Sequence, residues 1–109
     1  MAQKGATAVR DGVQVIQGTP TAPITCATLF LRLLRVGEGK KARTRATLFM
    51  VRPGPTADYV VKELIPDLEL EPQAALEKTI AIAKRGEVSV VYLNADLERI
   101  PKRRVAANG

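Results

Sequence analysis

Histidine and tryptophan are absent from this sequence of 109 residues, and cysteine occurs once. Without histidine the chain lacks the usual activator of serine and cysteine nucleophiles, a common zinc ligand, and the side chain that titrates near neutral pH. The composition therefore predicts a protein that is not an enzyme, has no catalytic residues, and binds no metal or other cofactor.

The single cysteine, Cys26, excludes an intrachain disulfide, and its apolar neighbours predict a small, buried side chain rather than a reactive thiol. Long apolar runs are also missing. The longest apolar stretch, residues 24–34, is interrupted by Arg32 and is too short to cross a bilayer. The first residues lead into no apolar segment of the kind that a secretory signal needs. We expect a cytoplasmic protein that makes no use of a membrane.

Aromatic residues are few, so the core must consist mainly of aliphatic side chains; the four aromatics are Phe30, Phe49, Tyr59 and Tyr92. With 46% hydrophobic residues, the chain has the apolar content of an ordinary globular protein. Its length suits one domain better than two. We therefore predict a single domain over residues 1–109, with a folded core at about 6–100 and a flexible basic tail at 101–109.

The first half of the chain carries strand signals. Asp11-Gly12 lies between β-prone flanks in residues 7–16, which predicts a hairpin with a type I′ turn. Residues 24–36 fit either a strand or a helix ending at Gly37, and we favour the strand. Residues 41–52 alternate between apolar and polar side chains, basic at the near end, which predicts the partner strand.

The second half carries helix signals. Thr56 can cap a helix that continues to Ile65 and is stopped by Pro66. A second helix is predicted over residues 72–85, from the position of Pro72 to the exit at Gly86, and a buried central strand over 88–93. The predicted fold class is α+β: a mainly antiparallel sheet of four or five strands, with two helices on one face.

Charge is segregated along the chain, which has a net charge of +6. Cations dominate residues 32–52 and return after residue 99, whereas carboxylates dominate residues 58–77. A basic β-ribbon can neutralise phosphates and is narrow enough to enter a major groove. The candidate nucleic-acid-binding residues are Arg35, Lys40, Lys41, Arg43, Arg45, Arg52, Lys102, Arg103 and Arg104.

These cations predict a basic nucleic-acid-binding protein, of the kind that a phage or mobile element uses as a regulator. No aromatic residue is interleaved with the cations at 40–45, so stacking on single-stranded bases is not predicted there. The alternative is an assembly or inhibitor module, including a phage structural protein, that applies the same surface to an acidic protein partner. Basic and acidic segments on one chain also favour homo-oligomers.

Asp67, Glu69 and Glu71 recur at every second residue, so an extended segment would present all three on one side. Three such carboxylates could hold Mg²⁺ in a nuclease, the exception we allow to the non-enzymatic reading. The Glu-x-Lys that would complete a nuclease pattern is missing. We favour a charged solvent face, or an acidic surface that receives the basic hairpin of another subunit.

Overall fold

The computed structural model describes residues 7–102, and within them six strands form one mixed sheet in the order β1-β2-β6-β3-β4-β5. One α-helix and two short 3₁₀ turns complete these residues. The elements are β1 (Thr7–Arg10), β2 (Val13–Gln17), β3 (Thr28–Val36), η1 (Gly39–Lys41), β4 (Arg43–Pro53), β5 (Tyr59–Glu69), α1 (Pro72–Arg85), β6 (Val90–Leu93) and η2 (Leu97–Arg99).

The predicted hairpin at the start of the chain is confirmed. Strands β1 and β2 pair antiparallel, with Arg10 opposite Val13. Asp11 and Gly12 have φ angles of 53° and 81°, the left-handed pair that a type I′ turn requires.

Strand β6 is central, as the apolar character of residues 88–93 predicted. It lies between β2 and β3 and is parallel to both. Parallel strands need a crossover connection, and α1 carries the chain from β5, at one edge of the sheet, back to β6 at its centre. The predicted helix at 72–85 is confirmed to the residue, with Pro72 in its first turn and Gly86 at its C-cap.

The strand alternative for residues 24–36 is correct, although β3 begins only at Thr28. It pairs antiparallel with β4 from Thr28 opposite Val51 to Val36 opposite Arg43. Directly opposed residues share a face of the sheet. Leu29, Leu31 and Leu33 therefore face α1, while the even-numbered residues of β3 face away from it.

The predicted helix over residues 56–65 is wrong, because this segment belongs to β5. Tyr59, Val60 and Val61 are β-branched or aromatic and pair with β4, which satisfies the backbone groups that point toward β4. Pro66 is tolerated because β5 lies at the edge of the sheet, where one row of N–H groups has no neighbouring strand. The predicted fold class is corrected accordingly: the sheet is mixed and has six strands, and one α-helix covers it.

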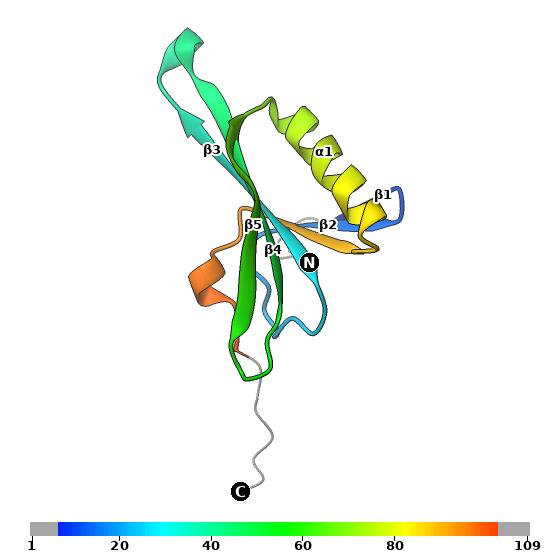
Figure 1. The fold of residues 1–109 in the computed structure, drawn as a ribbon. Coiled ribbons are helices and arrows are strands. Elements are labelled where there is room, and N and C mark those ends of the chain that lie inside the picture. The colour runs from blue at the N-terminus through cyan, green and yellow to red at the C-terminus, as the bar shows by residue number, and fades with distance from the viewer. Residues whose placement is uncertain (1–6, 103–109) are drawn as a thin grey trace, which may run out of the picture.

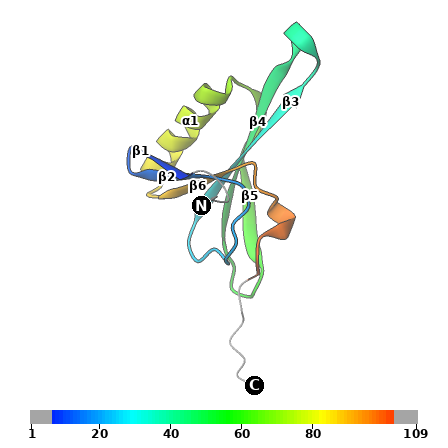
Figure 2. The same cartoon turned by 180° about the vertical axis from the view of Figure 1, so that it is seen from behind.

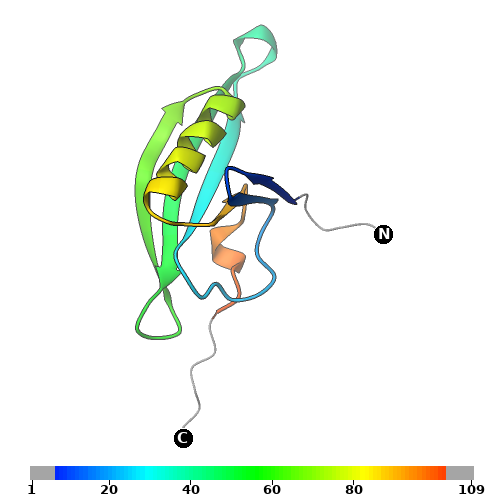
Figure 3. The ribbon, with the colours of Figure 1, turned by 90° about the vertical axis from the view of Figure 1, so that its right-hand side faces the viewer.

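Two apolar clusters fill the two faces of the sheet. The larger one joins α1 to the sheet through Leu29, Leu48, Ile80 and Val91, all at most 4% exposed. The smaller one lies on the opposite face and contains Phe30, Val51, Ile24 and Ile100. Figures 1 and 3 show α1 on one face and the η2 segment on the other, which leaves part of that second face uncovered.

Cys26 is exposed and not buried as its neighbours suggested, since it lies in the connection that precedes β3. In residues 7–102, no helix has the length and apolar character needed to cross a membrane.

Candidate functional site

The hairpin formed by β3 and β4 extends past the end of α1 as a two-stranded projection (Figures 1 and 2). We call residues 34–45 the arm. Its tip turns through Gly37 and Gly39, which have φ angles of 94° and 60°. A Cβ at position 37 would lie 3.1 Å from the Lys41 carbonyl oxygen, so the tight turn favours glycine there.

Three of the predicted cations are exposed on the arm without an ion pair to any other described residue. Lys40 and Lys41 lie in η1 at the tip, and Arg35 precedes it on β3. The backbone of the tip is fixed by hydrogen bonds from Lys41 N to the Glu38 carbonyl and from Ala42 N to the Gly39 carbonyl, each 3.2 Å. The fold thus presents three separate positive charges at its projecting end.

Two further predicted cations are paired with the acidic strand β5. Arg43 Nη1 lies 3.2 Å from Glu69 Oε2, and Arg45 Nε lies 3.5 Å from Asp67 Oδ1. The basic and acidic segments therefore meet within one chain. This is the charge complementarity on which the predicted homo-oligomer rested, and here it is satisfied internally.

The other two predicted cations that the structure describes lie at the opposite end of the sheet. Arg52 stands nine residues after Arg43 on β4, roughly 30 Å along an extended strand. Lys102 is near the β4–β5 turn, where its Nζ lies 3.9 Å from Asp58 Oδ1. Arg103 and Arg104 lie outside the described residues. The predicted residues thus form no single patch: five belong to the arm, and two lie at the far end.

The three alternating carboxylates do not form one row. Asp67 has a φ angle of 20° and lies next to the irregular part of the β4–β5 pairing, while Glu71 stands at the N-cap of α1. Within residues 7–102, no group of three or more His, Cys, Asp or Glu side chains is placed to hold a metal ion.

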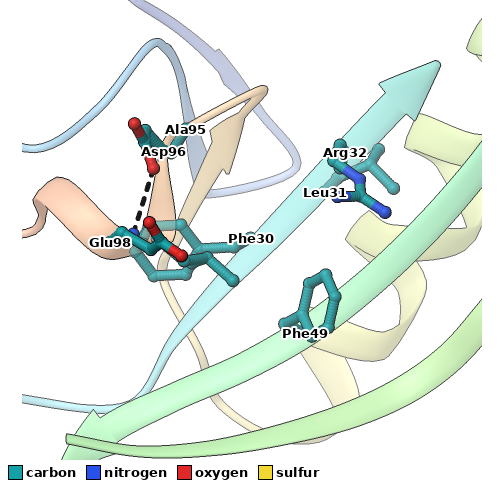
Figure 4. Close-up of a pocket in the computed structure, with 8 residues that line it drawn as sticks. Phe30, Leu31, Arg32, Phe49, Ala95, Asp96 and Glu98 are labelled. Atoms are coloured by element: carbon teal, nitrogen blue, oxygen red, sulfur yellow. Dashed lines mark hydrogen bonds between the residues drawn. The ribbon is translucent and has the colours of Figure 1, made fainter.

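A cavity that the sequence analysis did not anticipate lies beside the arm, on the face opposite α1. Its volume is about 380 Å³, and it opens between the η2 segment and strands β3 and β4 (Figure 4). It is lined by Phe30, Leu31, Arg32, Phe49, Ala95, Asp96, Leu97 and Glu98. Phe30 and Phe49 are far apart in the sequence, and only the strand register, which sets them opposite each other, brings them to one cavity.

Aromatic packing supports the floor of the cavity. The rings of Phe30 and Tyr92 stack with centroids 5.3 Å apart and planes inclined by 17°. Burial raises the pKa of the Tyr92 phenol above its usual value of 10.0. Phe30 is buried, whereas Phe49 is only partly buried and offers ring surface to the cavity.

Comparison with known proteins gives no functional guide. No protein-family model, no curated protein and no solved structure matches this chain.

Proposed function

We propose that the protein is a non-enzymatic nucleic-acid-binding protein whose arm contacts the phosphate backbone. The observation that carries the proposal is the position of Lys40 and Lys41 at the projecting tip and of Arg35 at the base of the arm, all three exposed and free of ion pairs to the described residues. Each cation that meets a phosphate releases condensed counterions, which favours binding without sequence preference. The arm has five cations, and the carboxylates near them are those of Glu38, Asp67 and Glu69, so the arm keeps an excess positive charge.

The ion pairs of Arg43 and Arg45 do not remove these residues from the interface. Their side chains are 71% and 44% exposed, and ion pairs at such positions contribute only about 0–1 kcal/mol. An incoming phosphate can therefore replace the carboxylate partner at little cost. Loss of the pairing would also bring Asp67 and Glu69 closer to full solvation, which limits the repulsion that they exert.

An acidic protein surface is the second candidate partner, and one observation favours it. Leu34 and Val36 are 53% and 41% exposed on the arm, opposite Arg45 and Arg43 in the strand register. Apolar side chains between cations are typical of a surface that is dehydrated by a protein partner. In this reading the arm would join two proteins in an assembly, including an assembly of identical chains.

Fluorescence anisotropy with a labelled single strand and a labelled duplex tests the proposal. We expect binding at about 50 mM salt that weakens steeply by about 200 mM. The variant Lys40→Gln/Lys41→Gln should lower the affinity and make the slope of log K against log salt roughly 1.4–1.8 less steep.

The matched control is Lys78→Gln/Lys84→Gln on α1, which removes the same net charge away from the arm. If the two double variants lowered the affinity equally, only the net charge would matter, and the arm would be rejected as the contact surface. Absence of binding to either nucleic acid at low salt would reject nucleic acid as the partner.

We place this activity in the cytoplasm, where nucleic acid is accessible and a free, exposed thiol such as that of Cys26 stays reduced. A phage or mobile-element regulator remains the role that we propose for such a protein.

A further inference from the structure

The cavity beside the arm combines an apolar floor with charged walls of opposite sign. Arg32 comes from β3, and the carboxylates of Asp96 and Glu98 come from the η2 segment on the other side (Figure 4). Phe49 comes from β4, opposite Phe30 in the strand register, and the ring of Phe30 lies beside Glu98. A ligand that fits must therefore have a flat apolar body, hydrogen-bond donors on one edge, and negative charge near the opposite edge.

The two carboxylates have different roles. Asp96 Oδ1 accepts a hydrogen bond from Glu98 N at 3.1 Å, and its Oδ2 lies 3.3 Å from Arg99 Nε. Asp96 N also donates to Thr19 Oγ1 at 2.8 Å, which fixes the wall to the β2–β3 connection. Glu98 has no such partner for its side chain in residues 7–102, so its carboxylate is the one open to a ligand.

The wall is rigidly attached to the sheet. Asn94 leaves β6 with a φ angle of 55°, and its Oδ1 accepts a hydrogen bond from Leu33 N at 2.8 Å. Its own N–H donates to the Leu31 carbonyl at 2.8 Å. These two hydrogen bonds of Asn94, one through its side chain and one through its backbone, fix the distance between the η2 wall and strand β3, which preorganises the cavity.

We propose that this cavity binds one unstacked nucleobase of a single strand whose phosphates run along the arm. This inference rests on the proposed function and names its substrate class. The base would lie against the ring of Phe49 and under the guanidinium of Arg32, because aromatic rings and guanidinium planes both stack on bases. Its exocyclic amine would donate to Glu98, as carboxylates accept from the cytosine amine in base readout.

The strand register connects the cavity to the arm. Arg32 stands opposite Thr47, Leu34 opposite Arg45, and Val36 opposite Arg43, all on the face away from α1. Arg45 and Arg43 are thus successive same-face positions, roughly 7 Å apart along the strand. A backbone leaving the cavity meets one cation after another on its way to Lys41 at the tip.

This geometry predicts which bases are preferred. Cytosine, adenine and guanine carry an exocyclic amine that can donate to the carboxylate. Uracil and thymine have a carbonyl oxygen in place of this amine, and their one donor on that edge, N3–H, lies between two carbonyl oxygens that repel the carboxylate. The open carboxylate of Glu98 should therefore disfavour uridine and thymidine. The phosphate contacts of the arm should be the same for every base.

Anisotropy titrations with labelled homopolymers of about eight nucleotides test the inference at one fixed, low salt concentration. We expect cytidine and adenosine oligomers to bind about tenfold more tightly than the uridine oligomer. Phe49→Leu should weaken the cytidine complex about tenfold, the loss typical of one stacked base. Glu98→Gln should abolish the preference, whereas Glu77→Gln on α1 removes the same charge and should keep it.

A second measurement tests the cavity without any variant, in case Phe49→Leu folds poorly. In NMR spectra of the wild-type protein, CMP should shift the amides of residues 30–32, 49 and 95–98, and UMP should shift them less at the same concentration. This test uses the cavity alone and does not need the arm.

The outcomes separate the two proposals. Equal affinity for all homopolymers, with binding still weakened by Lys40→Gln/Lys41→Gln, would overturn the base site and leave backbone binding intact. No binding of any oligomer would overturn this inference, and the proposed function would fall with it only if the duplex also failed to bind. Occupation of the cavity by a peptide that the cytidine oligomer cannot displace would assign the site to protein instead.

Discussion

Tyr59 joins three separate segments through a single hydroxyl group. The hydroxyl accepts a hydrogen bond from Ile24 N at 3.2 Å and donates one to the Pro101 carbonyl. Ile24 and Ile100 are each 7% exposed and belong to the smaller apolar cluster. The phenol therefore holds the β2–β3 connection and the segment after η2 against the start of β5.

Tyr59→Phe should lower the free energy of unfolding by about 1–3 kcal/mol, because the Ile24 N–H would be left unsatisfied in a partly buried site. Urea unfolding measures this loss. Phe49→Tyr adds a hydroxyl on the same face and serves as a control for the aromatic change. A Tyr59→Phe protein as stable as the wild type would show that water replaces both hydrogen bonds.

Tyr92 gives stability a dependence on alkaline pH. Burial raises the pKa of its phenol in the folded protein above the value of 10.0 expected when unfolded. The folded state therefore holds this proton more tightly, so the contribution is complete below about pH 10 and is lost as pH rises through the folded-state pKa. Tyr92→Phe should show a shallower fall in melting temperature between about pH 9 and 11. Parallel curves for both proteins would contradict the assignment.

In the η2 segment, which closes one side of the cavity, Asn94 has a left-handed backbone and a side chain that accepts a hydrogen bond from β3. Asn94→Gly keeps the left-handed backbone but removes the acceptor for Leu33 N, which should cost about 0.5–1.5 kcal/mol. Asn94→Ala should cost about 1–2 kcal/mol more, because a Cβ strains the left-handed conformation. Chemical denaturation of the two variants measures the cost of the lost hydrogen bond and the cost of the backbone strain. An alanine variant at least as stable as the glycine variant would disprove the strain.

Local signals in the sequence predicted those elements whose geometry is set locally. Asp11-Gly12 specified its turn, and Pro72 with Gly86 bracketed the helix, since in each case backbone chemistry at one or two residues decides the outcome. Residues 56–65 failed because Val60, Val61 and Leu64 fit both a helical and an extended pattern. Pairing with β4 decided between them, and that contact is remote in sequence.

The candidate site was predicted only in part for the same reason. The cations of the arm could be read from the sequence, because a basic strand and a glycine turn are local features. The partners Glu69 and Asp67 could not, since they reach Arg43 and Arg45 only through the β4–β5 pairing. The cavity depends on segments near residues 30, 49 and 97, which no local pattern links.

In the whole molecule, one face of the sheet is used for packing and the other face carries the candidate binding site. The face under α1 contains the larger apolar cluster and supplies most of the packing. The opposite face is covered only partly, by η2 and the connections around it, and there Arg43 and Arg45 of the arm follow the cavity along the strands. The net charge of +6 is therefore less informative than the position of five cations on the arm at one projecting end of the sheet.

The most direct measurement is an amide NMR titration of the whole chain with an unlabelled cytidine oligomer at low salt. We expect shifts in the arm, residues 34–45, and around the cavity, with little change along the exposed side of α1. These shifts should disappear on raising the salt concentration. Shifts centred on α1, or none at all at low salt, would contradict the claim that this face binds a nucleic acid.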